Sequence, residues 1–222
     1  MDLFAAQENN APEPEWLGPR LALLRGFASS RGPEIVRAIS GIERQAGWRT
    51  MKTPGGRSMS VETTNAGAAG WYTDRSGYRY SPVDPLTDQP WPSIPPVLSE
   101  LASGAARAAD FEAFDPDACL VNRYWPGSKM GLHQDRDEAD MSQPIVSVSL
   151  GLSAIFLWGG MTRGGSPKRM PLVHGDVLVW GGDDRLRFHG VAPVKDGPIP
   201  DGVRDYWPFG ECRINLTFRR AL

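Results

Sequence analysis

The sequence has little of what marks a membrane or secreted protein. No stretch approaches the roughly 18 consecutive apolar residues that a membrane-spanning helix needs. The first residues lack the basic flank and long apolar stretch of a signal peptide. Only two cysteines, Cys119 and Cys212, are present, which is too few for a disulfide framework. These absences predict a cytoplasmic protein that is not attached to a membrane.

Charge of one sign is also not in excess. The 24 basic and 26 acidic residues leave a formal net charge of −2. This balance excludes neither nucleic acids nor small anions as ligands, but it means that any anion site must be built locally. No internal repeat is visible in the chain.

Glycine and proline are abundant, with 25 and 20 residues among 222. They favour many turns over a helical bundle. Apolar residues recur at helical spacing only in the first half, from Pro33 to Ile42 and from Pro95 to Ala108. From Asp117 onward the period changes to two, as in half-buried strands. The pattern predicts a mainly β, α+β fold with a sandwich or jelly-roll core and two flanking helices.

The predicted strands are short and are separated by Gly, Pro and Asp. They cover residues 119–125, 146–150, 155–158, 169–173, 176–180, 186–191 and 212–218. We expect one structural domain in three parts. These are a flexible N-terminal arm over 1–18, a region of helices and a long loop over 19–115, and the β core over 116–222.

The long loop is predicted over residues 71–96, between the two helices. This stretch is dense in aromatic residues, prolines and aspartates. A connection of such length is unusual in a compact domain, and long ordered loops are often functional. Either a functional loop or a rigid surface excursion fits the sequence.

The three histidines, His133, His174 and His189, leave few ways to build a histidine-based metal site. His133 and Asp135 face the same side on an extended strand, whereas on an α-helix they would point about 200° apart. A fold that places the strand-like segment of His189 beside them would gather two imidazoles and one carboxylate. That set leaves open positions on the metal, as in non-haem Fe(II) oxygenases. The alternative is a polar surface pair and a packed strand histidine, and His174 is assigned a structural role.

The last predicted strand alternates strictly in polarity. Arg213, Asn215, Thr217 and Arg219 fall on one face, and apolar residues fall on the other. A basic face on an otherwise apolar strand is costly unless it is exposed or meets an anion. Two guanidinium groups could bind a dicarboxylate such as 2-oxoglutarate. The alternative is an exposed edge strand protected by arginine.

Two features qualify the dicarboxylate interpretation. The six residue steps from Arg213 to Arg219 span roughly 20 Å on a strand, which is longer than 2-oxoglutarate. The guanidinium groups must therefore lean toward each other, or the strand must bend. Asn122 and Tyr124 share a face of another predicted strand and could supply further donors, although by themselves they fit a structural role better.

Taken together, these residues resemble the AlkB family of Fe(II)/2-oxoglutarate-dependent dioxygenases. The shared motifs occur in one order: Asn122-Arg123-Tyr124, His133-x-Asp135, His189 and Arg213-x-Asn215-x-x-x-Arg219. Other stretches are similar to bacterial members of the family, namely residues 53–56, 70–71, 77–78, 116–120, 145–151 and 175–182. The resemblance covers nearly the whole chain after the N-terminal arm.

The resemblance implies a double-stranded β-helix (jelly roll) preceded by a nucleotide-recognition lid. It implies that Fe(II) is bound by His133, Asp135 and His189. It implies that 2-oxoglutarate is held by Asn122, Tyr124, Arg213, Asn215 and Arg219. It places Trp71 and Tyr78 in the lid, with Asp137 and Arg163 near the substrate base. Two departures from the bacterial pattern bear on substrate range: a longer segment over 198–211, and Tyr72 and Asp74 in the lid.

The implied activity is oxidative demethylation of N-alkylated bases, such as 1-methyladenine and 3-methylcytosine, in single- or double-stranded DNA or in RNA. The reaction consumes O2 and 2-oxoglutarate and releases succinate, CO2 and formaldehyde, and we expect a monomer. The base must leave its stack to reach the iron, and Trp71 would be a stacking platform. Three alternatives stay open: a 2-oxoglutarate-dependent oxygenase acting on RNA or protein, a non-catalytic jelly-roll binding module that contains a metal, and a plain single-strand binder.

Overall fold

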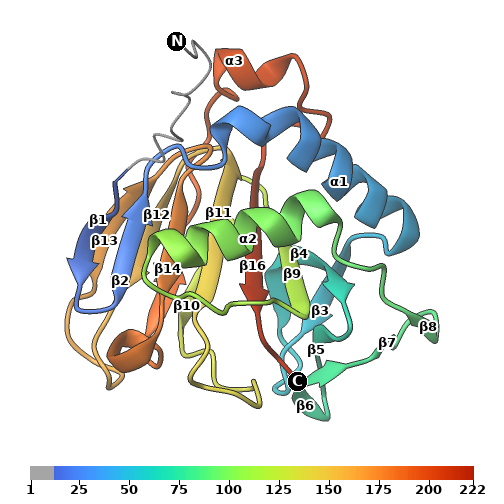
Figure 1. Cartoon of the computed structure of the whole chain (residues 1–222). Coiled ribbons are helices and arrows are strands. Elements are labelled where there is room, and N and C mark those ends of the chain that lie inside the picture. The colour runs from blue at the N-terminus through green and yellow to red at the C-terminus, as the bar shows by residue number, and fades with distance from the viewer. Residues whose placement is uncertain (1–12) are drawn as a thin grey trace, which may run out of the picture.

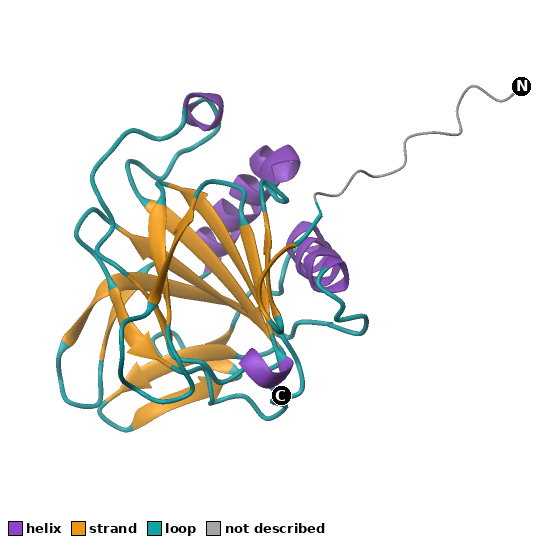
Figure 2. Cartoon of the chain, turned by 90° about the vertical axis from the view of Figure 1, so that its left-hand side faces the viewer, coloured by secondary structure: helices purple, strands orange, loops and turns teal. Residues whose placement is uncertain are grey.

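Two antiparallel sheets form the centre of the computed structural model, which describes residues 13–222. The two long helices lie on one side of the larger sheet (Figures 1 and 2). The smaller sheet packs on the other side, where the rings of Phe156 and Trp158 lie 5.9 and 6.0 Å from the ring of Trp180 in the larger sheet. The fold is mainly β and has the jelly-roll core that the sequence predicts.

The larger sheet has eight strands. In spatial order they are β1 (Glu15–Gly18), β2 (Leu21–Leu24), β14 (Val177–Trp180), β11 (Ile145–Gly151), β16 (Arg213–Arg219), β9 (Ala118–Tyr124), β4 (Ser58–Gly67) and β3 (Arg49–Lys52). The smaller sheet has four strands, in the order β10 (Met130–His133), β15 (His189–Val191), β12 (Ala154–Trp158) and β13 (Lys168–Leu172).

Strand β16 lies in the middle of the larger sheet. Asn215 is opposite Ser149 of β11 on one side and opposite Asn122 of β9 on the other. All seven residues of β16 are buried. The edge-strand alternative for this segment is therefore wrong, and its polar residues lie inside the molecule.

The predicted long loop contains two short hairpins instead. The first is formed by β5 (Gly70–Asp74) and β6 (Gly77–Ser81), and the second by β7 (Val83–Asp84) and β8 (Gln89–Pro90). Gly77 has φ +119° at the turn of the first hairpin, which favours glycine there. Aromatic residues on β5 and β6 have high strand propensity, and this overrides the turn signals of the flanking prolines and aspartates.

The two predicted helices are present as α1 (Gly32–Gln45) and α2 (Pro96–Ala108), which are labelled in Figure 1. Each begins with proline in its first turn, where the missing N–H costs nothing. The rest of the helical structure comprises η1 (Ser29–Arg31), η2 (Gly182–Asp184) and α3 (Asp201–Arg204). The sequence predicts helices only in the first half of the chain, and this is wrong for η2 and α3. Single helical turns are too short to show a helical period in the sequence.

Two predicted boundaries differ from the structure. Residues 1–12 of the predicted arm lie outside the described residues, but its last part forms β1, where Glu15 accepts a hydrogen bond from Arg25 Nε at 3.2 Å. The strand predicted over 186–191 is only His189–Val191. The residues before it continue from the turn η2, since the Arg187 N–H bonds to the carbonyl of Asp184.

Buried apolar side chains from both sheets and both long helices form one continuous cluster within the described residues. Over the same residues, no helix combines the length and the apolar character needed to cross a membrane. The sheets thus surround a shared core, and the site described next opens between them.

Candidate metal and co-substrate site

Strand pairing brings the three predicted metal ligands together. His133 ends β10 and lies directly opposite His189 of β15 in the antiparallel pair, with Asp135 two residues further on. His133 Nε2 is 3.5 Å from Asp135 Oδ1, and His189 Nε2 is 3.7 Å from Asp135 Oδ2. One ligand atom from each of the three residues lies within 4.8 Å of the others. The shared-face geometry predicted from the two-residue spacing is therefore present.

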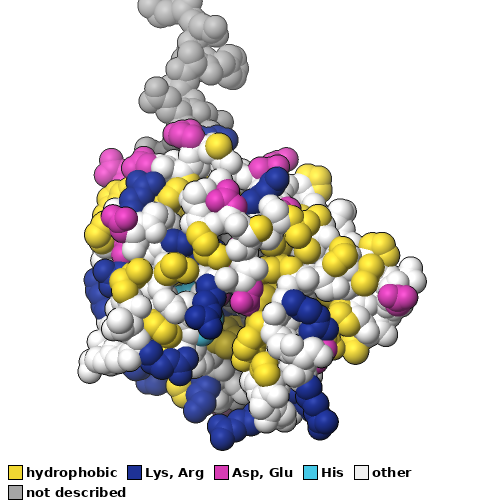
Figure 3. Space-filling view, turned by 90° about the horizontal axis from the view of Figure 1, so that it is seen from below, with side chains coloured by type: hydrophobic (Ala, Val, Ile, Leu, Met, Phe, Trp, Pro, Cys, Tyr) yellow, Lys and Arg dark blue, Asp and Glu magenta, His cyan; other side chains and the backbone are white. Residues whose placement is uncertain are grey.

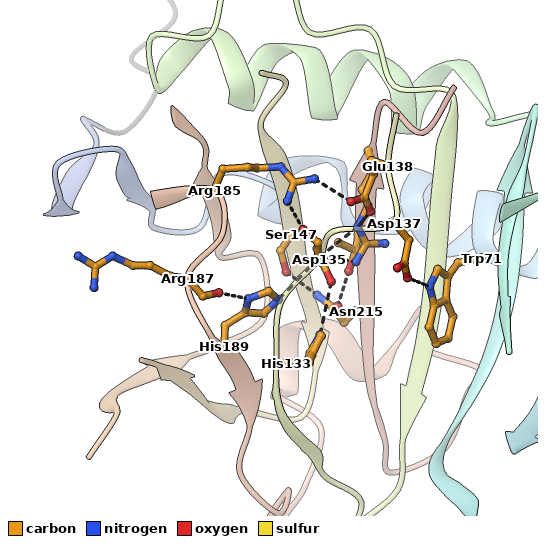
Figure 4. Close-up of polar contacts among 12 residues, drawn as sticks. Trp71, His133, Asp135, Asp137, Glu138, Ser147, Arg185, Arg187, His189 and Asn215 are labelled. Carbon is orange, nitrogen blue, oxygen red and sulfur yellow. Dashed lines mark hydrogen bonds and ion pairs between the residues drawn. The ribbon is translucent and has the colours of Figure 1, made fainter. Parts of the chain in front are cut away.

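Backbone carbonyls orient both imidazoles. His133 Nδ1 is 2.9 Å from the carbonyl of Gly131, and His189 Nδ1 is 3.0 Å from the carbonyl of Arg187 (Figure 4). An Nδ1–H donated to a carbonyl leaves Nε2 as the free lone pair. Both Nε2 atoms then face the Asp135 carboxylate, as metal ligands do.

The surroundings set the charge of each ligand. Burial opposes ionisation of Asp135, but the Arg219 charge and the two imidazoles hold the pKa of its carboxyl well below the usual range. Burial and the neighbouring His133 lower the pKa of His189 to about 4. Burial likewise opposes the charge on His133, but Asp135 raises the pKa of this imidazole. At neutral pH, Asp135 and His189 are thus in the forms that bind metal ions.

This donor set fits Fe(II). Two imidazole nitrogens and one carboxylate bind from one side and leave further positions for ligands from the cavity. Among residues 13–222, no other group of His, Cys, Asp and Glu side chains is close enough to hold a metal ion. A metal ion held by these three residues would keep coordination positions open for other ligands, whereas structural metal sites usually fill all positions with protein ligands.

Arg219 adjoins the metal ligands. Its Nη2 donates to Asp135 Oδ2 at 2.6 Å, and its Nε lies 3.1 Å from the same oxygen. Burial opposes its charge, but Asp135 and the nearby Tyr80 and Glu138 raise the pKa of Arg219. A permanent positive charge therefore lies next to the metal position.

Arg213, at the other end of β16, is buried without a carboxylate partner. It is 1% exposed, and its Nη2 donates to Ser149 Oγ at 3.0 Å. Within residues 13–222 its Nε and Nη1 have no hydrogen-bond partner, and the guanidinium lies 5.0 Å from the centre of the Tyr124 ring. The buried Asn122 Oδ1 likewise has no partner in the described part of the chain. Because buried guanidinium donors are rarely left unpaired, this region fits an anionic ligand such as a carboxylate.

Asn215 lies between the two arginines and is held by the sheet. Its Nδ2 donates to Ser147 Oγ at 2.8 Å and to the carbonyl of Val148 at 2.9 Å, and its Oδ1 accepts from Thr217 Oγ1 at 2.9 Å. The orientation of its amide is therefore fixed. The two arginines lie at opposite ends of the strand, where Arg213 bonds to Ser149 and Arg219 bonds to Asp135.

A cavity of about 650 Å³ opens over the metal ligands. All predicted site residues line it except Arg213, which lies beyond Tyr124. Other lining residues include Met59, Ser60, Leu120, Met130, Phe156, Trp180 and Phe188. Figure 3 looks into this hollow, where histidine is visible at the bottom and Lys and Arg side chains gather near the rim.

Aromatic side chains of the β5–β6 hairpin form one wall of the mouth. Trp71 and Tyr78 stack with ring centres 5.6 Å apart, and Tyr78 is 51% exposed. Trp71 Nε1 donates to Asp137 Oδ2 at 3.0 Å (Figure 4). Arg163 lies across the mouth, donating to the carbonyl of Leu132 at 2.8 Å. Asp137 thus holds the tryptophan, a contact that the sequence did not predict.

The other features that the sequence singled out lie away from the cavity. His174 accepts the Gly151 N–H at 3.1 Å and lies 3.2 Å from the Tyr206 hydroxyl, which is the structural role predicted for it. No residue of segment 198–211 lines the cavity in the described chain, and neither do Tyr72 and Asp74. The expectation that these departures bear on substrate range gains no support from the cavity.

Sequence reasoning missed a buried ionic cluster behind the metal ligands. It consists of Asp135, Glu138, Arg185 and Arg219. Arg185 donates to the backbone carbonyl of Asp135 at 2.7 Å and to Glu138 Oε2 at 3.0 Å. No local pattern in the sequence marks Glu138 or Arg185 as buried, because the two residues are 47 positions apart and meet only in the fold.

The chain is similar to known oxygenases along almost its whole length. A profile of the 2OG-Fe(II) oxygenase superfamily matches residues 20–219. The chain is 49% identical over 221 residues to the alpha-ketoglutarate-dependent dioxygenase AlkB of Escherichia coli (strain K12), an alignment that covers 100% of this chain and 98% of that protein. It is 41% identical over 109 residues to the nucleic acid dioxygenase ALKBH1 of Mus musculus, covering 49% of this chain and 28% of that protein.

A solved structure has the same architecture. The structure of OsALKBH1 superposes on this chain with a TM-score of 0.83 at 31% sequence identity. The superposition covers 93% of this chain and 99% of that chain. The similarity therefore includes both sheets and the long helices that flank them.

Proposed function

Because the chain belongs to the 2OG-Fe(II) oxygenase superfamily, we propose that it removes methyl groups from alkylated bases in nucleic acid. It is a dioxygenase that uses Fe(II), 2-oxoglutarate and O2. The observation that carries the substrate proposal is the position of the metal ligands, at the bottom of a cavity whose mouth is walled by the stacked Trp71 and Tyr78. Aromatic faces at such a mouth suit an unstacked base.

The proposed roles at the centre follow from the charges. His133, Asp135 and His189 hold Fe(II). Arg219, which is bonded to Asp135, meets the keto-acid end of 2-oxoglutarate beside the metal. Arg213 meets the far carboxylate, because its unpaired donors lie on the other side of Tyr124. Asn122 and Tyr124 supply further polar contacts between the two ends, and Asn215, whose amide N–H groups are bonded within the sheet, lines the space between them.

With these groups bound, the centre supplies an oxidation that places a hydroxyl group on an N-methyl carbon while 2-oxoglutarate becomes succinate and CO2. The hydroxymethyl group then leaves the nitrogen as formaldehyde, which restores the base. The contribution of the chain is to position both substrates and to exclude side reactions. The half-exposed His133 forms the cavity side of the metal site, so the methyl group approaches past its ring.

We propose that Trp71 and Tyr78 contact the base and that Asp137 favours its charge. Adenine alkylated at N1 and cytosine alkylated at N3 are cationic, and a nearby carboxylate stabilises a cation. Asp137 uses Oδ2 for Trp71, which leaves Oδ1 free for a base. Arg163 and Lys129 at the rim suit phosphate groups.

The test is release of formaldehyde and succinate from oligonucleotides that carry a single 1-methyladenine or 3-methylcytosine. We expect both products in equal amounts, with Fe(II) and 2-oxoglutarate required. Matched DNA and RNA oligonucleotides and methylated peptides separate the DNA proposal from the RNA or protein alternative. Turnover of peptides with no formaldehyde from any methylated oligonucleotide contradicts the proposal.

The remaining parts of the proposal concern the state of the protein. We propose that it acts as a monomer in the cytoplasm. Both cysteines are buried and unpaired, which is compatible with a reducing compartment. Light scattering of the purified protein at micromolar concentration, with and without an oligonucleotide, tests the monomer.

A further inference from the structure

Glu138 is a buried carboxylate to which the proposed reaction assigns no role. Its side chain is 2% exposed. Its Oε1 accepts a hydrogen bond from the Tyr80 hydroxyl at 2.7 Å and lies 3.1 Å from Arg219 Nε. Its Oε2 accepts from Arg185 Nη2 at 3.0 Å. A fully buried carboxylate with three partners is strongly fixed in position, because loss of any partner leaves a buried charge uncompensated.

Through its two arginines, Glu138 reaches the metal ligand Asp135 along two routes. Arg219 bonds to the carboxylate of Asp135, and Arg185 bonds to its backbone carbonyl at 2.7 Å. Both the side chain and the main chain of that ligand are thus held by groups that Glu138 holds in turn. Glu138 itself does not contact the cavity groups that would bind iron.

On its other side, Glu138 holds the hairpin that forms the cavity mouth. Tyr80 of β6 lies directly opposite Trp71 of β5, so the two side chains share one face of the hairpin. Trp71 is bonded to Asp137, and Tyr80 is bonded to Glu138 (Figure 4 shows both acids). Two consecutive acidic residues therefore hold both members of one cross-strand pair.

Charge balance makes this connection responsive to the co-substrate. The ionic cluster contains two carboxylates and two guanidinium groups, so it is neutral as it stands. Arrival of the 2-oxoglutarate carboxylate at Arg219 adds a competitor for the same N–H groups. Arg219 must then redistribute its bonds among Asp135, Glu138 and the ligand. Any change at Glu138 is passed to the half-buried Tyr80, because its hydroxyl makes no other hydrogen bond within residues 13–222.

We propose that Glu138 and Tyr80 are positioning residues that couple occupancy of the co-substrate site at Arg219 to the order of the β5–β6 hairpin. The coupling rests on the role proposed above for Arg219, and it adds a physical connection between the co-substrate and the base-binding wall. Thermodynamic linkage makes this coupling reciprocal: if co-substrate binding orders the hairpin, then a hairpin ordered through Tyr80 also strengthens co-substrate binding.

The test compares Tyr80→Phe with Tyr72→Phe. Tyr80→Phe removes only the hydroxyl that bonds to Glu138. Tyr72 lies on the opposite face of the same hairpin, with its ring under Arg79, and its hydroxyl makes no hydrogen bond within residues 13–222. The two variants therefore share the chemical change and the hairpin but differ in the connection to Glu138.

Two quantities are measured with Mn(II) in place of Fe(II) and without nucleic acid. One is the dissociation constant of 2-oxoglutarate by calorimetry. The other is amide hydrogen exchange over residues 70–81 with and without 2-oxoglutarate. We expect 2-oxoglutarate to slow exchange in the wild type and in Tyr72→Phe. In Tyr80→Phe this protection disappears, and the dissociation constant rises about 3- to 10-fold, as expected for one hydrogen bond.

Each outcome is decisive. If 2-oxoglutarate protects the hairpin of Tyr80→Phe as it does in the wild type, or leaves the wild-type hairpin unchanged, the coupling is overturned. Equal loss in Tyr72→Phe overturns it as well, because the effect then belongs to the hairpin in general. Failure of the wild type to bind 2-oxoglutarate contradicts the proposed function instead. Glu138→Gln should lose the same protection, and if that variant does not fold, Tyr80→Phe decides alone.

Discussion

Replacing Arg213 by methionine should stabilise the ligand-free protein and weaken 2-oxoglutarate binding. Arg213 is a fully buried side chain, and its only hydrogen bond within the described residues is to the neutral hydroxyl of Ser149. Burial lowers the pKa of this guanidinium, with Tyr124 opposing the shift. The folded protein therefore bears the cost of a charge that only a ligand can compensate.

The magnitudes follow from that arrangement. Replacement of buried ionic groups by apolar side chains of similar size is neutral to stabilising, and here we expect a gain of about 1–2 kcal/mol without ligand. For a chain of this length, that gain corresponds to a melting temperature about 2–8 °C higher. Loss of a buried charge-assisted contact should weaken 2-oxoglutarate binding by about 2–4 kcal/mol, or roughly 30- to 1,000-fold.

Thermal melting with and without 2-oxoglutarate, in the presence of Mn(II), measures both effects in one assay. The control is Arg204→Met, on α3 with the arginine side chain 60% exposed, which should change neither quantity. If Arg213→Met instead lowers the melting temperature and leaves 2-oxoglutarate affinity intact, Arg213 is a structural residue. The assignment of the far carboxylate to this arginine would then be refuted.

Four further predictions concern the metal, the base, the reactivity of the thiols and the pH dependence of stability. Asp135→Asn should weaken metal binding more than about 100-fold, since outer-shell partners alone are worth 10–100-fold, and metal titration followed by fluorescence measures this. Trp71→Ala should raise the KM for a methylated oligonucleotide roughly 5- to 150-fold, which corresponds to a stacking energy of about 1–3 kcal/mol, whereas Trp71→Phe keeps most of the stacking; equal losses would contradict a stacking role. Burial raises the pKa of Cys119, and it raises that of Cys212 to about 12, so neither thiol should react with Ellman's reagent at pH 8 before denaturation. In the unfolded chain the thiols ionise above their ordinary pKa of 9.0, whereas in the folded protein they stay protonated. The free energy of unfolding should therefore fall as the pH rises past 9.0, and denaturant titration at several pH values measures this.

Local patterns identified the elements that repeat a short period. The helices α1 and α2 were predicted from apolar residues at three- to four-residue spacing, and β11 and β16 from strict alternation. Such periods depend only on backbone geometry, so they can be read without knowing what the element packs against. The strand predicted over 186–191 and the loop over 71–96 were described incorrectly, because there a turn or a hairpin partner decides the local conformation.

The chemical identity of the site was likewise present in the sequence. His133, Asp135 and His189 are the residue types that bind Fe(II), and the alternation of β16 marked Arg213 and Arg219. The sequence left open whether these side chains meet an anion or protect an exposed edge. Central placement of β16 between β11 and β9 decided that question.

Only the tertiary structure decided which distant segments become neighbours. It paired His133 with His189 across β10 and β15, seated Glu138 between Arg185 and Arg219, and bonded Asp137 to Trp71. The side-chain period of a strand is a property of its own backbone, whereas the choice of a partner strand depends on the packing of the whole chain. For this reason the ligands and the polar strand could be named from the sequence, but the ionic cluster behind them could not.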